Sequence, residues 1–310
     1  MNYTLHQLSI FLKVVELKSI TKTSEQMFLS QPAVSIQLKS FQDQFNLPLI
    51  EMIGKKVFVT EFGQEVAMHA KIILEQLEEI KNKALAFEGL IYGTLKIAVV
   101  STGKYIMPYF ISDFLHQHQG VKLQMDVTNK EAVMESLKRN MVDFALVSIV
   151  PNDIAVEAVE LMDNNMFLVG NDEISHSKKN NFQSIIEQYP LIYREVGSGT
   201  RQTIEKFIKD QKIVVQNKIE LTSNEAVKQA ILANIGVSVM PLIGLKNELL
   251  NGDIKILPCQ QLPLKTTWQL IWLKEKKLSY LSKRYLAYLE SAKSSIIERQ
   301  FDWIKKFVVN

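Results

Sequence analysis

A helical pattern without proline runs from residue 61 to residue 90 and constrains the fold more than any other feature of the chain. Its apolar residues are spaced alternately by four and three positions: Val66, Ala70, Ile73, Leu77, Ile80, Ala84 and Phe87. A narrow seam with a period of about 3.5 residues is buried best against a second copy of itself. An amphipathic helix lying on its own domain, the alternative, usually shows a wider apolar face at a period of about 3.6. We therefore predict a linker helix that forms a homodimer.

Residues 1–60 predict three short helices followed by a β-hairpin. The first helix is marked by apolar residues at helical spacing: Leu5, Leu8, Phe11, Leu12 and Val15. Ser19 then caps a second helix, which runs through Lys22 to Phe28. Ser30-Gln31-Pro32 opens a third helix, with proline in the first turn where its missing N–H costs nothing. Two short helices joined by a tight turn are typical of a helix-turn-helix that reads DNA.

The third helix and the hairpin carry the expected DNA contacts. The apolar residues Val34, Leu38, Phe41 and Phe45 define the buried face, which leaves small polar residues on the opposite side. Two lysines follow Gly54 in the turn between two short strands, where they can reach phosphate groups. The candidate DNA-binding residues are Lys22, Ser30, Gln31, Pro32, Ser35, Ile36, Lys39, Lys55 and Lys56.

Strands alternate with helices after residue 93. The expected strands cover residues 95–99, 121–127, 142–150, 166–169, 191–196, 218–221, 236–240 and 267–273, and a final helix begins at Leu278. This alternation predicts an α/β fold on a parallel sheet. In such sheets, ligands bind beyond the carboxyl ends of the strands, at the N-termini of helices.

Hydroxyl and amide side chains follow most of these strand ends, and one turn adds glycines and a guanidinium. The candidate effector-binding residues are Ser101, Thr102, Thr128, Ser148, Gly197, Ser198, Gly199, Thr200, Arg201, Ser223 and Asn224. Backbone N–H groups, a helix dipole and an arginine favour a small anion. Ser223 and Thr128 are equally well explained as ordinary helix caps, and Arg194 as a surface or salt-bridge residue.

Enzyme motifs are absent from the sequence. Gly197-Ser198-Gly199 lacks the outer spacing of a nucleophile elbow, and Thr102-Gly103-Lys104-Tyr105 lacks the earlier glycine and the following hydroxyl of a P-loop. The histidines are isolated or point apart, and Cys259 has no obvious basic partner. We therefore expect no catalytic residue, no metal site and no required cofactor, and we predict that the protein is not an enzyme.

Composition and patterning indicate a cytoplasmic protein. The 310 residues carry a formal net charge of +3 and one cysteine, so no disulfide can form within the chain. The N-terminus carries charges inside its apolar pattern and no cleavage site, unlike a signal peptide. The longest apolar stretch, residues 231–245, is interrupted by Asn234, Ser238 and Pro241 and is too short to span a membrane.

The chain resembles the LysR-type transcriptional regulators of bacteria over nearly its whole length. The residues that carry the resemblance are Leu8, Phe11, Val15, Glu16, Ser19-Ile20-Thr21, the run SQPAVS at residues 30–35, Gln37, Leu38, Leu49, Lys56, Thr60 and Gly63. Within the family it is most similar to the Calvin-cycle regulator branch (CbbR or RbcR type), on IGKKVFVTEFG, GTLKIAVVSTGKY, EVGSGTR and SNEAVKQAILANIGVSVMP. Departures from the usual pattern are Thr23-Ser24, Ile36, Phe41, Phe45-Asn46 and Met52.

The resemblance implies an all-α winged helix-turn-helix (residues 1–60), a linker helix (61–90) and a two-lobed α/β domain like a periplasmic binding protein (91–310). Lobe I would comprise residues 93–163 and 268–310, and lobe II residues 164–267. Gln31, Pro32 and Ser35 match the base-reading positions. Lys55 and Lys56 match the wing, and Ser101, Thr102, Thr128, Gly199, Thr200 and Arg201 match the effector cleft.

The function implied is an effector-responsive DNA-binding regulator, controlled by a small anionic metabolite between the lobes. Its expected partners are a double-stranded DNA operator, a second copy in a homodimer that pairs into a homotetramer, and RNA polymerase as a further candidate, but no membrane. The alternatives are a cytosolic solute-binding receptor without a transcriptional role, an α/β enzyme, and a nucleoid-type architectural protein. The residues 291–310 extend beyond the usual end of the family and are expected to pack as an extra helix or to join an interface.

Overall fold

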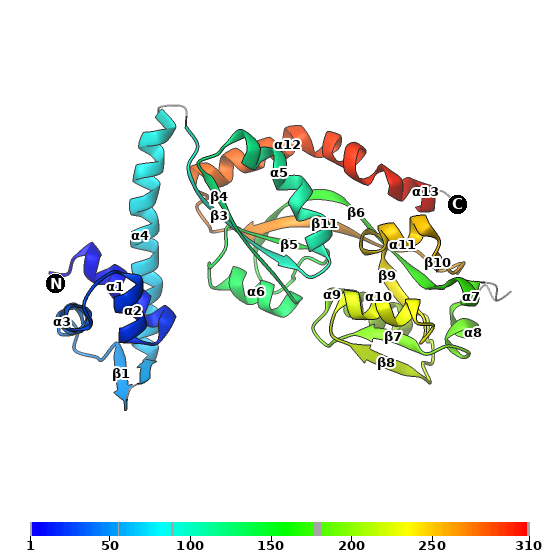
Figure 1. Ribbon diagram of the computed structural model, residues 1–310, viewed down its shortest axis with the longest axis horizontal. Helices are drawn as coiled ribbons and strands as arrows, with labels where there is room; N and C mark the ends of the chain where they lie inside the picture. Colours follow the sequence, from blue (N-terminus) through cyan, green and yellow to red (C-terminus); the bar gives the residue numbers. More distant parts are fainter. Residues whose placement is uncertain (1, 55, 88–89, 176–180, 309–310) are drawn as a thin grey trace. The chain divides into compact units, whose positions relative to one another are not determined.

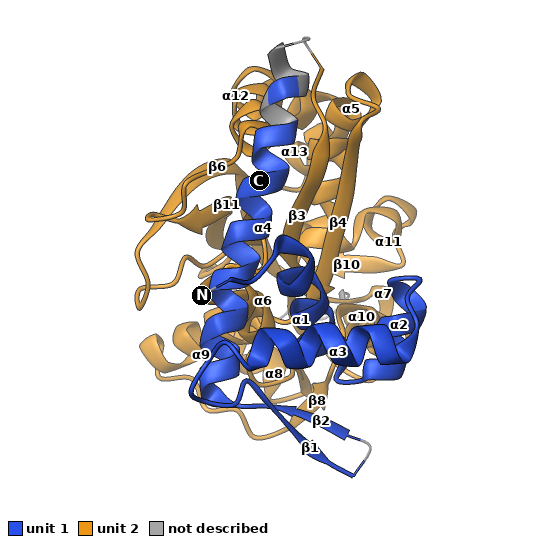
Figure 2. Cartoon of the chain, turned by 90° about the vertical axis from the view of Figure 1, so that its left-hand side faces the viewer, with its two compact units in different colours: residues 1–89 blue, residues 90–310 orange. Residues whose placement is uncertain are grey.

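The computed structural model describes residues 2–54, 56–87, 90–175 and 181–308. The chain divides into two compact units, residues 1–89 and residues 90–310, which are coloured separately in Figure 2. The predicted fold, a helix-turn-helix with a long helix followed by an α/β domain, is confirmed. Within the described residues, no helix is both long and apolar enough to cross a bilayer.

Unit 1 consists of short capped helices, a hairpin and one long helix. Its elements are α1 (Leu5–Leu17), α2 (Ile20–Gln26), α3 (Gln31–Gln42), β1 (Ile50–Ile53), β2 (Lys56–Val59) and α4 (Glu61–Phe87). Each of the three short helices starts at a hydroxyl cap: Thr4, Ser19 and Ser30 each accept a hydrogen bond from the backbone N–H group three residues on. The second helix was predicted to reach Phe28, but Phe28 has a positive φ of 55°, which ends the helix before it.

Aromatic side chains form much of the core of unit 1. Phe41 contacts the rings of Tyr3, Phe11 and Phe45 at centroid distances of 5.2–5.4 Å, and Phe45 packs in turn on Phe62. Phe45 therefore belongs to the core as predicted, although α3 itself ends at Gln42. These contacts hold α3 against α1 and against the start of α4.

The seam of α4 divides into a buried part and an exposed part. Ala70 is buried and Val66 is partly buried against the core of unit 1. Ile73 is 42% exposed, Leu77 44% and Ile80 67%, and Ala84 is also exposed. The side chain of Phe87 lies outside the described residues. A single chain thus leaves the central part of the seam uncovered.

Unit 2 alternates strands and helices as predicted (Figure 1). Its first half contains β3 (Gly93–Val100), η1 (Gly103–Tyr105), α5 (Met107–Gln117), β4 (Val121–Thr128), α6 (Lys130–Lys138) and β5 (Phe144–Val147). Its middle contains β6 (Val156–Asn171), α7 (Asp172–Ser175), α8 (Phe182–Ile186), β7 (Leu191–Arg194), α9 (Gly199–Asp210), β8 (Lys218–Leu221), α10 (Asn224–Leu232), β9 (Ser238–Pro241), η2 (Leu242–Gly244), α11 (Lys246–Asn251) and β10 (Ile254–Ile256). It ends with β11 (Leu264–Leu273), α12 (Tyr280–Phe301), η3 (Asp302–Ile304) and α13 (Lys305–Val308).

The sheet of unit 2 is mixed, so the prediction of a parallel sheet was wrong in part. β3 pairs in parallel with β4 and β5, and β7 with β8. However, β11 runs antiparallel to both β5 and β6, and β6 runs antiparallel to β9 and β10. The long strand β6 begins ten residues before the predicted strand at 166. Its first part was missed because polar residues such as Asp163, Asn164 and Asn165 interrupt the apolar pattern.

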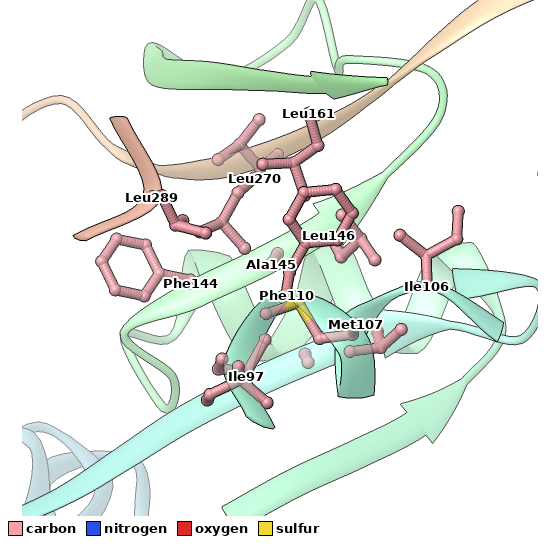
Figure 3. Packing of buried hydrophobic residues seen from close by; sticks show 14 of the residues in the cluster. Ile97, Ile106, Met107, Phe110, Phe144, Ala145, Leu146, Leu161, Leu270 and Leu289 are labelled. Carbon is pink, nitrogen blue, oxygen red and sulfur yellow. The ribbon is translucent and has the colours of Figure 1, made fainter. Parts of the chain in front are cut away.

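Unit 2 has separate hydrophobic cores in its two halves, which the strands β6 and β11 connect. The first core lies between β3, β5, α5 and α12; Figure 3 shows Ile97, Phe110, Phe144, Leu146 and Leu270 within it. Two further clusters lie on opposite faces of the C-terminal half of β6 and of β9, and residues of β7 contribute to both. We keep the names lobe I (residues 93–163 and 268–310) and lobe II (164–267) for these halves. The strands β6 and β11 pass between them, with a register shift at Trp268/Gln269.

Candidate functional site

The outer face of α3 is polar and accessible. Gln31, Pro32, Ile36 and Lys39 are exposed and Ser35 is partly buried, whereas Val34 and Leu38 lie in the core. The hydroxyl of Ser30 accepts a hydrogen bond from the backbone N–H of Ala33 (3.3 Å), so Ser30 caps the start of α3. The structure therefore brings the predicted α3 residues together on one face, which is 65% exposed at Ile36.

The remaining residues predicted to contact DNA lie beside α3 in sequence but on other elements. Lys22 is exposed on α2, and Lys56 is exposed in the hairpin, where it pairs with Ile53 across the turn. Lys55 lies outside the described residues. The wing also exposes apolar side chains, since Met52 is 50% and Ile53 62% exposed.

The unusual Thr23-Ser24 pair is accommodated inside the helix-turn-helix. Both side chains are buried, at 0% and 6% exposure. The hydroxyl of Thr23 donates to the backbone oxygen of Ser19 (2.8 Å), and that of Ser24 donates to the oxygen of Thr21 (2.7 Å). Because both buried hydroxyls are hydrogen-bonded within their own helix, they keep the tight packing of the motif.

A pocket lies in unit 2 where the strand ends of the two lobes meet. Its lining comes from the ends of β3, β5 and β7 and from the N-termini of α6 and α9: Val100, Ser101, Thr102, Asn129, Lys130, Val147, Ser148, Ile149, Arg194, Ser198, Gly199 and Thr200. The cavity measures about 20 Å³, enough for one water molecule. Of the predicted effector residues, Ser101, Thr102, Ser148, Ser198, Gly199 and Thr200 meet here.

Arg194 is the buried cation of this pocket. It is 4% exposed and forms two hydrogen bonds of 2.8 Å with the carboxylate of Glu195. Its Nη2 also donates to the hydroxyl of Ser101 in lobe I at 3.2 Å. The sequence left the role of Arg194 open because nothing in its local pattern separates a ligand contact from a salt-bridge residue.

Arg201, by contrast, points away from the pocket. Its guanidinium pairs with Glu205 (2.7 Å between Nε and Oε1) and with Glu220, and its Nη1 donates to the backbone oxygen of Arg194. Hydrogen bonds to Glu205 and Glu220 raise the pKa of Arg201. The structure thus places this side chain over the Tyr193 ring in a separate hollow beside β8. Arg201, which was predicted to bind the effector, therefore does not line the pocket.

Four other predicted effector residues do not line the pocket. Thr128 ends β4, and the hydroxyl of Ser223 caps α10 by accepting from the N–H of Ala226 (3.0 Å). Asn224 is buried, and its side-chain N–H₂ group has no hydrogen-bond partner. Gly197 has a φ of +87°, so its role is to allow the turn before α9.

Two residues at the start of α6 line the pocket and were not predicted. Asn129 caps the helix by accepting from the N–H of Ala132 (2.9 Å), and Lys130 donates to Gln202 of α9 at 2.9 Å. Burial lowers the pKa of Lys130, while the nearby Asp153 acts in the opposite direction. The signal available in the sequence was a helix start directly after a strand, with a cation in its first turn.

The pocket has the charge distribution of an anion site. The N-termini of α6 and α9 carry the positive ends of two helix dipoles. The hydroxyl of Ser198, the N-cap residue of α9, makes no capping hydrogen bond, which leaves first-turn N–H groups for a ligand. Together with Arg194 and Lys130, these groups favour a carboxylate or phosphate.

The described residues offer little for metal or thiol chemistry. No group of three or more His, Cys, Asp or Glu side chains among them is arranged to hold a metal ion. Burial raises the pKa of Cys259 to about 11, so its thiolate is scarce at neutral pH.

Family models match both units of the chain. Residues 5–64 match the bacterial regulatory helix-turn-helix protein of the lysR family, and residues 89–293 match the LysR substrate binding domain. The chain is 32% identical to the HTH-type transcriptional activator CmpR of Synechocystis sp. over 93% of this chain and 95% of CmpR. It is 34% identical to the RuBisCO operon transcriptional regulator of Allochromatium vinosum, over 90% of this chain and 93% of that protein.

Solved structures support the same comparison. The regulatory domain of CcmR from Synechocystis, in complex with 2-PG (2-phosphoglycolate), is 30% identical with a TM-score of 0.61, covering 65% of this chain and 97% of that domain. A full-length OxyR variant from Pseudomonas aeruginosa has a TM-score of 0.73 at 19% identity, over 96% and 95% of the two chains. CbnR in complex with its target DNA has a TM-score of 0.65 at 17% identity, over 93% and 99%. The last two show the fold.

Proposed function

Because the chain belongs to the LysR family of bacterial transcriptional regulators, we propose that α3 reads a DNA operator and that the pocket of unit 2 binds the controlling anion. Its full-length relatives in the Calvin-cycle regulator branch are named transcriptional regulators, which supports a regulatory and not a catalytic role. The protein acts in the bacterial cytoplasm, where its operator is.

The DNA-reading role rests on the exposed face of α3. Gln31, Ser35 and Lys39 follow one another along the helix, and α3 is held firmly against α1 by its aromatic contacts. Side chains of this kind donate and accept hydrogen bonds at base edges in the major groove, while Lys22 and Lys56 provide phosphate contacts. Ile36, one of the departures from the usual family pattern, offers an apolar side chain, which suits the methyl group of thymine.

The effector role rests on Arg194 in the pocket, and this is the single observation that carries the proposal. A buried guanidinium beside Ser101, between two helix N-termini, provides directional donors for a carboxylate or phosphate. The related CcmR regulatory domain was solved with 2-phosphoglycolate, which has both groups. We propose a phosphorylated carboxylic acid, or a similar small anion, as the effector.

The exposed seam of α4 supports a homodimer. Ile73, Leu77 and Ile80 present their side chains to solvent along the predicted stripe of the helix. A dimer covers this stripe and fixes the spacing of two reading helices, and two dimers then form the tetramer. An effector changes DNA binding only if it binds the two arrangements of such an assembly with different affinity.

A binding experiment tests this function. The wild-type protein selects duplexes from a random DNA pool, and the affinity for the selected duplex is measured with and without 2-phosphoglycolate. We expect specific binding and a change of the affinity or of the protected length with the ligand. A protein that selects no sequence contradicts the DNA-reading role, whereas ligand titration by calorimetry tests the pocket independently.

A further inference from the structure

The C-terminal segment beyond the family's matched region lies across both lobes of unit 2. The substrate-binding model ends at residue 293, so the end of α12, with η3 and α13, falls outside it. In Figure 1, α12 extends along one side of the long strands and α13 lies close to α11 of lobe II. We define residues 294–308 as the strap.

The first half of the strap is anchored in lobe I. Ile296 is 1% and Phe301 3% exposed, and both belong to the core of that lobe. The ring of Phe301 packs on Tyr109 (5.5 Å) and Phe110 (5.9 Å) of α5, and Arg299 forms an ion pair with Asp113 of the same helix.

The second half of the strap packs on lobe II. Trp303 and Ile304 contact the cores of both lobes, whereas Phe307 and Val308 pack only on the lobe II cluster. The ammonium group of Lys246, at the start of α11, lies 5.9 Å from the centre of the Trp303 ring. The strap therefore joins the lobes independently of the two strands β6 and β11.

The pocket is lined by the N-termini of α6 and α9. In Figure 1 these helices lie on the opposite side of the long strands from α12. Two hydrogen bonds join the lobes there: Arg194 to Ser101, and Lys130 to Gln202. The cavity of about 20 Å³ between them is too small for any organic anion, so ligand entry requires the lobes or their side chains to move apart.

We propose that the strap is a conformational restraint that holds the two lobes in this closed arrangement and so opposes effector binding. The proposal depends on the effector role of the pocket. A ligand that needs a wider pocket must work against every contact that stabilises the narrow one. The strap packs on both lobes across the strands from the pocket, so a rotation about these strands that widens the pocket must displace Trp303 and Phe307 from their close packing. Loosening the strap then raises the apparent affinity for the anion.

Hydrogen exchange on the full-length protein tests the restraint without a ligand. We compare wild type with a chain that stops after Ile304, which removes the contacts made only to lobe II and keeps the lobe I anchor. We expect amides of β6 (156–171) and β11 (264–273) to exchange about three- to tenfold faster. Phe307→Ser is the second variant, and Glu298→Ser, at an exposed position of α12, is the matched control.

Calorimetry with 2-phosphoglycolate then tests the regulation. We expect the shortened chain and Phe307→Ser to bind about three- to tenfold more tightly than wild type, and Glu298→Ser to bind equally. Unchanged exchange rates in β6 and β11 would show that the strap does not restrain the lobes. Faster exchange with unchanged or weaker anion affinity would show that the strap restrains the lobes but does not oppose effector binding. If neither wild type nor the variants bind the anion, the effector class is wrong, while the exchange rates still decide whether the strap holds the lobes.

Discussion

The reading surface of α3 and the pocket of unit 2 are built in opposite ways. The α3 surface comes from one stretch of nine residues, 31–39, whose order along the helix fixes which side chains face outward. The pocket comes from the ends of three strands and the starts of two helices, spread from Val100 to Thr200. The residues of a surface on one helix follow from helical periodicity, whereas those of a composite pocket depend on the direction in which side chains from distant parts of the sequence point.

The largest effect is expected at the α3 surface. Ser35→Glu places a carboxylate on the face proposed to meet DNA, where it is expected both to remove a base contact and to repel phosphate. A lost contact of this kind costs about 1–3 kcal/mol before repulsion is added, so we expect specific affinity to fall about 100-fold or more. Fluorescence anisotropy with the selected duplex measures it.

The control for this change is Ser295→Glu, which introduces the same charge at an exposed position of α12. It leaves DNA affinity within about twofold, because Ser295 is not among the residues proposed to contact DNA and a solvated surface charge is screened by salt. Equal affinity of Ser35→Glu and wild type contradicts the assignment of α3 as the reading helix.

The next effect concerns the seam that connects two reading helices. Ile73→Asp with Leu77→Asp places four carboxylates in the proposed dimer interface, where each lost apolar side chain is worth about 1.5–3 kcal/mol. We expect monomers in sedimentation equilibrium at micromolar concentrations, with helicity unchanged. Gln76→Asp with Lys81→Asp, at exposed positions of the same helix, is the matched control and stays dimeric. Dimers of normal stability in the seam variant rule out this interface.

The two arginines of lobe II test the composite site directly. Arg194→Ala removes the guanidinium in the pocket and leaves Glu195 without its partner, so we expect anion affinity to fall at least about tenfold. Arg201→Ala changes affinity less than about twofold, because its guanidinium pairs with Glu205 and Glu220 outside the pocket. Calorimetry with 2-phosphoglycolate, with thermal melts to verify folding, distinguishes them. The reverse ranking contradicts the geometry.

The sequence predicted the helix-turn-helix well because its signals are local. The Ser30-Gln31-Pro32 start of α3 and the four-three-four spacing of its apolar residues define both the helix and its exposed face without knowledge of the rest of the fold. The predicted end of α2 was wrong because Phe28 adopts a positive φ, and the hydrophobic pattern of the sequence does not indicate such a conformation.

The pocket was predicted by position along the chain but not by side-chain direction. Strand ends placed Ser101, Ser148 and Thr200 at one edge, and the structure brings them together. The directions of the two arginine side chains depend on different acidic partners: Glu195 pairs with Arg194 in the pocket, whereas Glu220 of β8, far along the chain, holds Arg201 outside it. Such pairing is a tertiary effect, so the sequence alone favoured the arginine in the glycine-rich turn.

The smallest effect is a pH dependence that also belongs to the composite site. Burial holds the pKa of Lys130 below the ordinary value for lysine. Its charge is therefore lost at a lower pH than that of an exposed lysine, and with it part of the attraction for an anion. Above about pH 7.5 the phosphate group of 2-phosphoglycolate is already fully ionised, because its second pKa is near 6, so ligand ionisation does not contribute. We expect affinity to weaken about two- to fivefold by calorimetry as the pH rises from about 7.5 towards 10.5, the ordinary lysine pKa, and Lys130→Gln to flatten this slope. A slope unchanged in Lys130→Gln places the titrating group elsewhere and removes Lys130 from the anion site.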